Sequence, residues 1–341
     1  MAGALVVLAG LVVAALAFAR ALPTGARPAA ATRTMTGGPP PASPSATPTP
    51  SPPPSAPFAV GLRVVTFVDH RREVLPPHTA SGRPEPRVLR TDVWYPALGT
   101  PGTSDVAEAP PARAGGPFPL VVFGPGFDMY PSAYEPLLHA WARAGFVVVA
   151  PTFPLTNPGT PGGPYEADMV NQPRDMAFVT TRILELSSAR TGFLQGMVDA
   201  AEIAVAGQSD GGDTALADAY SSCCRDPRVR AAVILSGQQL LPGTYGPPGG
   251  PPLLAAQGTG DTINVPEDTT QLYEDARPPK YLLLLLGADH LEPYTARTPW
   301  EKVVVRASIA FLDAELKGVP GALARMRAVG NAPGIATLSG G

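Results

Sequence analysis

Cysteine and lysine are both scarce in this sequence, and the scarcity of cysteine limits the disulfides and metal sites that the chain can form. The two cysteines, Cys223 and Cys224, are adjacent, so they form either a vicinal disulfide in an oxidising compartment or two buried free thiols. Their spacing provides no metal site. Lysine occurs only at positions 280, 302 and 317, which is typical of the codon bias of a GC-rich genome and predicts no function.

An excess of charge of either sign is also missing. The 25 basic and 28 acidic residues give a formal net charge of −3 at pH 7, so the charge balance does not predict nucleic acid as a partner. The 341 residues, 45% of them hydrophobic, are enough to bury one large core. We therefore expect a globular protein that does not bind nucleic acid.

An unbroken apolar run covers residues 2–19. It is long enough to cross a bilayer as a helix and also fits the hydrophobic region of a secretory signal, with a small-x-small cleavage pattern at 17–19. Arginine follows the run, beginning at Arg20, instead of preceding it, which by the positive-inside rule favours the opposite orientation. We expect export, with residues 1–22 either cleaved as a signal peptide or kept as an anchor. Any contact with a membrane is expected through this segment alone.

Proline marks the boundary of the folded part. Residues 23–57 are rich in Pro, Ala, Ser and Thr, and such a segment cannot bury enough apolar surface to fold. We predict a disordered linker here, either as an extended spacer or as the tail that remains after cleavage. Residues 58–341 are predicted to form one folded domain.

Short apolar runs alternate with helical segments along that domain. Two strand-like segments, 58–68 and 87–96, come first and are expected to pair antiparallel. Continuous apolar runs between helices are typical of a mostly parallel sheet that helices cover on both faces. We therefore predict an α/β fold with eight strands. The later six runs are 119–124, 146–150, 203–207, 230–237, 252–258 and 280–287, and the clearest helices are expected over 132–144, 173–190 and 299–317.

Glycines flank Ser209 at the end of one of these apolar runs. Residues 207–211, Gly-Gln-Ser-Asp-Gly, match the pattern G-x-S-x-G, in which the serine occupies a strained strand-to-helix turn. Functional residues of a parallel sheet gather at the carboxyl ends of its strands, and the helix after this turn points its N-terminus at the site. The pattern predicts that Ser209 is a nucleophile.

A serine nucleophile needs a histidine base, which follows it in the chain order of this motif. His290 is the one histidine of the four that lies after Ser209, and it follows the last of the apolar runs. We expect His139 to lie within a helix, where it packs or faces the surface, and His70 and His78 to lie in the N-terminal hairpin region. His290 is therefore the predicted base.

The base in turn needs a carboxylate that orients it, and this acid should follow the preceding strand. Asp261 lies in the loop after the run 252–258. Its competitors are Asp268, which is expected to begin a helix, and Asp289, which would point elsewhere because it is adjacent to His290. We predict that Asp261 fixes the tautomer of the imidazole.

An oxyanion hole is required because negative charge develops on the substrate oxygen in the transition state. One donor is expected to be the backbone N–H of Asp210, directly after the nucleophile. The second is expected to be the N–H of Phe127, after the Gly-Pro-Gly turn at 124–126. The alternative is that 124–126 is an ordinary glycine turn.

With these motifs the chain resembles the α/β-hydrolase superfamily over residues 58–320. VVFGPGF, GQSDGG, GTGDT and GADH occur in that order, and RVLRTDVWYPA at 87–97 is similar to the opening strands of acetylhydrolase-like members. The closest resemblance is to the branch that holds dienelactone hydrolases, platelet-activating-factor acetylhydrolases, chlorophyllases and polyester hydrolases. The resemblance implies a Ser-His-Asp hydrolase without a cofactor.

Some positions differ from that branch. Gln208 stands where many relatives have His, and no role is expected for it because it is outside the triad. Asp210 stands where polyester hydrolases usually have Met, which argues against large apolar polymers as substrates.

Residues 152–172 form the one sizeable insertion near the site and contain no long helical lid, so the pocket is expected to be open. Arg174 and Asp175 are expected to serve surface pairing or the helix dipole.

The sequence thus predicts an exported serine hydrolase that cleaves carboxylic esters of small to medium acyl groups through an acyl-enzyme. An amidase or an acyltransferase would use the same triad. A protein of another class, a catalytically silent binding module on the hydrolase fold, would be expected to lack a triad member. The glycine loops at 124–126 and 207–212 match neither the dinucleotide fingerprint nor the phosphate loop, so no cofactor and no metal is expected.

Overall fold

One mixed sheet of ten strands organises the computed structural model, which describes residues 57–245 and 250–341. The predicted export segment, 1–22, and nearly all of the predicted linker, 23–57, lie outside the described residues. In the part of the chain that is described, no helix combines the length and the apolar character needed to cross a bilayer.

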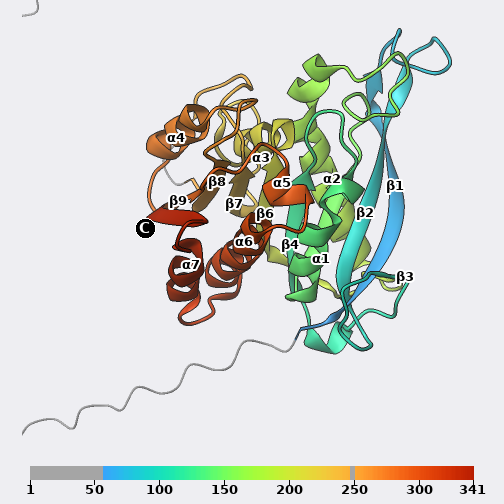
Figure 1. Cartoon of the computed structure of the whole chain (residues 1–341). Helices are drawn as coiled ribbons and strands as arrows, with labels where there is room; N and C mark the ends of the chain where they lie inside the picture. Colours follow the sequence, from blue (N-terminus) through green and yellow to red (C-terminus); the bar gives the residue numbers. More distant parts are fainter. Residues whose placement is uncertain (1–56, 246–249) are drawn as a thin grey trace, which may run out of the picture. The chain divides into compact units, whose positions relative to one another are not determined.

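The strands lie in the spatial order β10-β9-β8-β7-β6-β4-β5-β2-β1-β3 (Figure 1). Their bounds are β1 Ala59–Val74, β2 Glu85–Ala97, β3 Val106–Ala107, β4 Phe118–Gly124, β5 Val147–Pro151, β6 Val198–Gln208, β7 Val229–Leu235, β8 Leu253–Gly258, β9 Lys280–Leu285 and β10 Ala336–Gly340.

The helices follow the strands as predicted, with additions near the C-terminus. The α-helices are α1 Glu135–Arg143, α2 Gln172–Ser188, α3 Asp210–Tyr220, α4 Pro266–Asp275, α5 Glu292–Thr295, α6 Pro299–Lys317 and α7 Ala322–Gly330. Short 3-10 helices are η1 Arg113–Gly115, η2 Pro131–Tyr134 and η3 Glu166–Asn171.

The six apolar runs of the sequence form the parallel strands β4 to β9, and β2 joins them antiparallel through β5. The predicted count of eight strands is too low. The two additions are β3, a two-residue strand beside β1, and β10, which pairs antiparallel with β9. Neither contains an apolar run, since β3 is exposed and β10 buries only Ala336 and Leu338.

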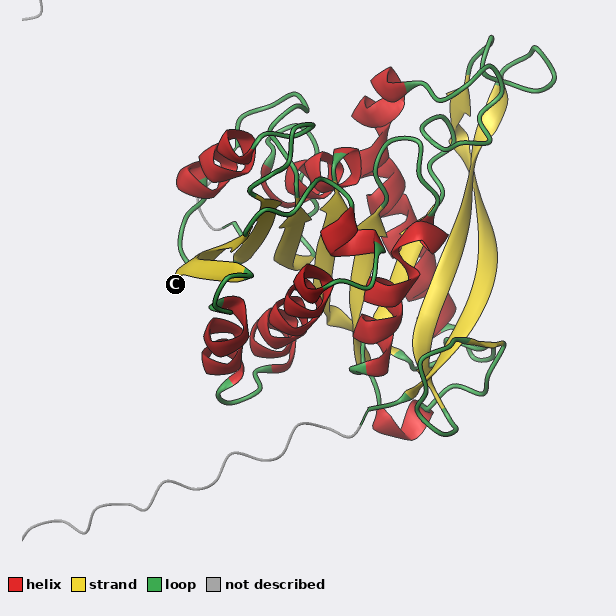
Figure 2. Ribbon diagram, in the orientation of Figure 1, coloured by secondary structure: helices red, strands yellow, loops and turns green. Residues whose placement is uncertain are grey.

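Two separate apolar layers hold the helices against the sheet (Figure 2). Inward side chains of α1, α6 and α7, such as Trp141, Phe311 and Met326, pack on one face. Those of α2, α3 and α4, such as Val179, Leu216 and Leu272, pack on the other. Because helices cover both faces, the central strands are buried throughout, which is why the sequence shows continuous apolar runs there.

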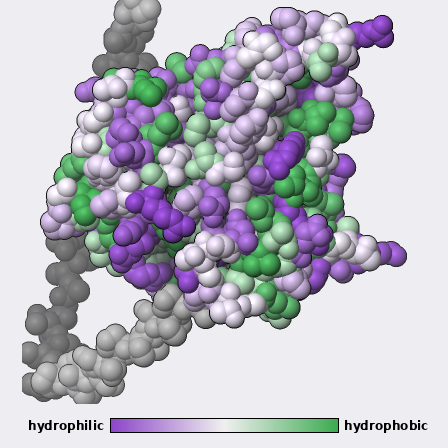
Figure 3. All heavy atoms as spheres, turned by 45° about the vertical axis from the view of Figure 1, so that its right-hand side comes forward, coloured by the Kyte–Doolittle hydropathy of each residue, from purple (hydrophilic) through white to green (hydrophobic). Residues whose placement is uncertain are grey.

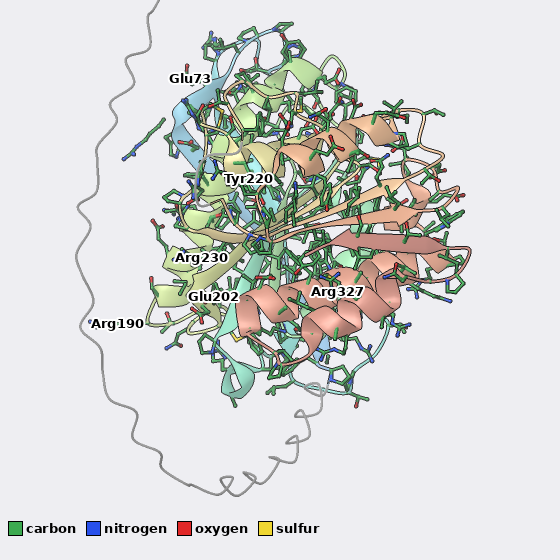
Figure 4. All side chains as sticks on the ribbon, turned by 90° about the vertical axis from the view of Figure 1, so that its left-hand side faces the viewer. Glu73, Arg190, Glu202, Tyr220, Arg230 and Arg327 are labelled. Atoms are coloured by element: carbon green, nitrogen blue, oxygen red, sulfur yellow. A yellow bond between two sulfur atoms is a disulfide. The ribbon has the colours of Figure 1, made fainter. Side chains whose placement is uncertain are left out.

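The two ends of the parallel strands differ in character. At the amino end, Glu202 of β6 and Arg230 of β7 lie near each other, and α3 ends at Tyr220, whose hydroxyl donates to the Pro251 carbonyl (Figure 4). On the face shown in Figure 3, hydrophobic residues occur in small groups among polar ones. The predicted site residues all follow the carboxyl ends of strands.

A buried ion cluster ties the β1–β2 hairpin to the segment that precedes α2. The Arg87 guanidinium donates two hydrogen bonds to Asp168, at 2.9 and 2.7 Å, and two to Asp175, at 3.0 and 2.6 Å. Arg72 also contacts Asp175, at 2.8 Å. The expectation of a surface role for Asp175 is therefore wrong, because this carboxylate is fully buried.

The disulfide between Cys223 and Cys224 is formed, in the segment between α3 and β7. Of the two alternatives that the sequence left open, the structure has the vicinal disulfide and no free cysteine among the residues described.

Candidate active site

The carboxyl edge of the sheet brings together residues from four connections. The loop after β4 carries Phe127, the turn after β6 carries Ser209, the loop after β8 carries Asp261, and the loop after β9 carries His290. Residues that lie far apart in the sequence meet here because neighbouring parallel strands all end at the same edge.

Ser209 occupies a strained turn between β6 and α3. Its φ of 55° and ψ of −128° lie outside the regions that non-glycine residues ordinarily adopt. The backbone of this turn packs tightly against itself and against the end of β4. A Cβ on Gly207 would collide with the backbone of Gly211, and a Cβ on Gly211 would collide with the Gly124 carbonyl. These contacts explain the glycines on both sides of the serine.

Ser209, His290 and Asp261 form one hydrogen-bonded chain. The Ser209 Oγ lies 2.9 Å from His290 Nε2, and His290 Nδ1 lies 2.7 Å from Asp261 Oδ2. All three side chains are buried. With Nδ1 protonated and donating to the carboxylate, the Nε2 lone pair faces the serine hydroxyl, which is the arrangement of a general base and its nucleophile.

Backbone and side-chain donors fix the Asp261 carboxylate. Its Oδ1 accepts the N–H groups of Ile263 and Asn264 at 2.9 and 3.1 Å, and its Oδ2 accepts from the Gln257 amide at 3.1 Å. These hydrogen bonds hold the carboxylate in the orientation that meets the imidazole.

The two competing acids are placed differently. Asp268 lies in the first turn of α4. Asp289 accepts the N–H groups of Leu291 and Glu292, at 2.9 and 2.8 Å, and so turns away from the imidazole. Among the described residues, Asp261 is the one carboxylate hydrogen-bonded to His290.

The backbone N–H groups of Asp210 and Phe127 are the two predicted oxyanion donors. Asp210 is the first residue of α3, so its N–H has no backbone acceptor within the helix and donates to the carboxylate of the same residue. Gly126 approaches the serine so closely that a Cβ on it would lie 3.2 Å from the Ser209 Cβ. The Gly126 N–H is used, since it donates to the Tyr134 hydroxyl at 3.1 Å, whereas none of the described groups accepts the N–H of Phe127.

Gln208 has a position that the sequence did not predict. Its side chain is fully buried, its Oε1 accepts from the Tyr134 hydroxyl at 2.7 Å, and its amide donates to the His290 carbonyl at 3.0 Å. The same amide nitrogen lies 3.2 Å from His290 Nε2. Through Tyr134, Gln208 therefore connects the loop that contains Gly126 to the predicted base, His290. Little in the sequence singled out Gln208, because the G-x-S-x-G pattern allows any residue at this position and an amide side chain is not itself a nucleophile, a base or an acid.

The first turn of α3 is acidic. Burial raises the pKa of Asp210 to about 6, and the negative charge of Glu166 adds to the rise. Burial also raises the pKa of Asp213 well above its ordinary value, although the backbone N–H of Gln238 donates to it. The Oδ2 atom of each carboxylate is buried and has no hydrogen-bond partner among the described residues. The site thus holds two buried carboxyl groups beside its nucleophile, and burial disfavours the charged form of each.

Asp105, Glu135 and His139 form the one group in the described part of the chain with the spacing of a metal site. His139 Nδ1 lies 2.6 Å from Asp105 Oδ1, and Nε2 lies 3.2 Å from the Gly102 carbonyl. Both partners are acceptors, so the imidazole must donate from both nitrogens as a cation and has no lone pair for a metal. We therefore assign His139 as a structural link between α1 and the loop after β2.

Replacing His139 by Gln should destabilise the protein in a pH-dependent way. Burial lowers the pKa of His139, but the hydrogen bond and charge of Asp105 outweigh that effect and the pKa is raised. The stabilisation is therefore complete below pH 6.5 and is lost as pH rises through the raised value. We expect a loss of about 1 to 2 kcal/mol in urea unfolding at pH 6 and much less at pH 9. The exposed His70, changed to Gln, is the control, and an equal effect at both pH values would contradict the link.

Two comparisons with known proteins find a family and a solved structure that are similar to this chain. A family model described as Chlorophyllase matches residues 99–234, a span that includes Phe127 and Ser209 and ends before Asp261 and His290. A solved structure of a ferulic acid esterase from Streptomyces cinnamoneus is similar, with a TM-score of 0.59 and 22% identity over 79% of this chain and 93% of that chain. A search of curated proteins finds no match. The predicted α/β-hydrolase fold is confirmed, and over residues 99–234 the chain is similar to the Chlorophyllase family.

Proposed function

We propose that this protein is a serine hydrolase that cleaves carboxylic esters through an acyl-enzyme. The observation that carries the proposal is the hydrogen-bonded chain from Ser209 through His290 to Asp261, built on a turn whose backbone is strained. A structural serine has no need of that strain, whereas a nucleophile must stand clear of the strand to meet a carbonyl carbon.

The reaction follows from the atoms that face one another. The Ser209 Oγ attacks the ester carbonyl while its proton moves to His290 Nε2, and the tetrahedral intermediate collapses when that proton passes to the leaving alcohol. Water then repeats the sequence: it loses a proton to Nε2, attacks the acyl carbon, and the proton returns to Ser209 as the acid departs. Asp261 holds the imidazole in the tautomer that accepts from serine and stabilises the imidazolium that forms.

The N–H groups of Phe127 and Asp210 are proposed to bind the oxyanion. Each is a fixed donor that requires no rearrangement during the reaction, and such donors contribute most when they are aimed at the charge that develops. The hydrogen bond from Gly126 to Tyr134 supports this assignment because it fixes the turn in which Phe127 follows.

Exposed apolar side chains around the site support a substrate with a hydrophobic part of small to medium size. Phe127 and Tyr130 follow β4, Ile263 follows β8 and Leu291 follows β9, and each is at least about one-third exposed. Residues 152–171 hold only the short helix η3 and no long lid. An open, partly apolar rim suits soluble esters, and the ferulic acid esterase offers an analogy for the reaction class.

The location is proposed to be outside the cytoplasm. The apolar run at 2–19 and the vicinal disulfide support export, since disulfides persist in oxidising compartments.

The proposal is tested with the full chain, p-nitrophenyl esters of increasing acyl length and a fluorophosphonate probe. We expect turnover of the shorter esters and covalent labelling of Ser209, with both lost in Ser209→Ala. The profile of rate against acyl length measures the acyl pocket, and a parallel series of anilides tests for an amidase. A folded protein that neither reacts with the probe nor hydrolyses any ester or anilide would be a binding module instead.

A further inference from the structure

Asp210 is a buried carboxylate next to the nucleophile that accepts a hydrogen bond from its own backbone N–H but has no cationic partner among the described residues. Only 6% of its surface is exposed, its Oδ2 accepts no hydrogen bond, and no ion pair in the described residues includes it. An unpaired buried charge costs free energy that a neutral side chain of similar shape would avoid. A carboxylate with a pKa of about 6 is nevertheless mostly ionised at pH 7.

The direction of the Asp210 side chain follows from its place in α3. Residues four positions apart share a helix face, so Asp210 faces the same side as Thr214. The Thr214 hydroxyl donates to the Gln172 amide oxygen at 2.7 Å, and Gln172 in turn donates to Thr156 at 2.8 Å. Asp210 therefore faces the segment between β5 and α2, which contains η3.

A second carboxylate lies on that segment. Glu166 begins η3, is exposed, and interacts electrostatically with both Asp210 and Asp213. No ion pair of the described residues includes Glu166. Asp210 and Glu166 are thus two acids close to each other without a cation, and Glu166 is exposed to solvent.

The reaction geometry says which part of an ester lies beside these acids. His290 and Asp261 follow β9 and β8, on one side of β6 in the sheet, whereas Glu166 follows β5, on the other side. The alcohol oxygen must face His290 to receive its proton. The acyl chain then extends to the opposite side, toward Asp210 and Glu166.

We propose that Asp210 and Glu166 form a subsite for a positively charged group, an amine or a quaternary ammonium, on the acyl part of the ester. This inference rests on the proposed hydrolase function. A cation there would give the buried Asp210 the partner that the protein does not supply, in surroundings where little water screens the attraction. An anionic acyl group would meet two like charges and be excluded.

The test compares two p-nitrophenyl esters of equal shape. One carries trimethylammonio-butyrate, and the other its neutral isostere, in which carbon replaces the nitrogen. Each kcat/KM is divided by the rate of alkaline hydrolysis to remove intrinsic reactivity. We expect the full-length protein to prefer the cationic ester by about tenfold or more. The ratio should fall about tenfold, to near one, in Asp210→Asn and by about two- to threefold in Glu166→Gln, because the buried charge is screened less than the exposed one.

The ratio is the readout because it divides out any loss that affects both esters, such as a shift of the Asp210 N–H. Glu267→Gln, which removes an exposed charge in α4, is the control and should leave the ratio within twofold. A ratio near one in the unmodified protein, or an equal fall in the control, overturns the subsite. A preference seen instead between butyrylcholine and its neutral isostere overturns its acyl placement.

The two proposals fail in different ways. Hydrolysis of the neutral ester without preference for the cation leaves the hydrolase intact and removes only the subsite. Absence of hydrolysis of either ester, together with no labelling of Ser209 by the fluorophosphonate, removes both.

Discussion

Ser209→Ala, His290→Ala and the double variant should each lower kcat for the best ester by roughly 10⁶-fold, and the double variant should be no slower than either single one. The serine oxygen can attack only as its proton moves to the imidazole, and the two atoms lie 2.9 Å apart in one hydrogen bond. Once either atom is lost, the second has nothing left to contribute. The free-energy costs are therefore strongly non-additive.

The measurement is single-turnover hydrolysis with the enzyme in excess, beside circular dichroism to establish that each variant is folded. Asp261→Asn is the graded comparison: it keeps the shape but favours the wrong tautomer, so a smaller loss, about 10⁴-fold, is expected. Additive losses in the double variant would show that Ser209 and His290 do not act in one step.

The Ser209 turn could be predicted from the sequence because its causes are local. Close packing of backbone against backbone requires glycine at 207 and 211, and that requirement is visible in five residues. The chain order of Ser209, Asp261 and His290 was equally visible, since each follows an apolar run and parallel strands end at one edge.

The residues around the site were harder to predict because their partners are distant in the chain. Gln208 meets His290 across 82 positions, and Asp175 meets Arg87 across 88. A carboxylate in the first turn of a helix is usually explained by the helix dipole, which is why the sequence suggested a surface role for Asp175. Only the arrangement of the hairpin over α2 shows that it is buried.

The C-terminal additions were missed for a different reason. The helix α7 and the strand β10 carry few inward apolar residues, because β10 is the edge strand beside β9 and α7 packs mainly on α6. Hydrophobic periodicity, which identified the central strands, is weak in elements that bury so little.

Arg87→Met should be the most destabilising single substitution outside the core, at about 3 to 5 kcal/mol. Its guanidinium makes four hydrogen bonds to Asp168 and Asp175, and all three side chains are buried. Methionine fills much of the same volume but leaves two carboxylates in the interior. Of these, Asp175 keeps only its ion pair with Arg72. The cost comes from those uncompensated charges more than from the attraction that is lost.

The pH dependence of that loss separates this explanation from a simple packing defect. Burial raises the pKa of Asp175, and the Arg87 guanidinium opposes the rise, so the pKa should rise further in the variant. A carboxyl with a raised folded-state pKa destabilises above that pKa and is relieved as it gains a proton. Urea unfolding should therefore show a larger loss at pH 8 than at pH 5. Arg71→Met, on the exposed side of the same hairpin, should cost under about 0.5 kcal/mol. If the loss of stability in Arg87→Met does not depend on pH, the two carboxylates are hydrated in the variant. Packing alone would then hold η3, and with it Glu166, against the hairpin.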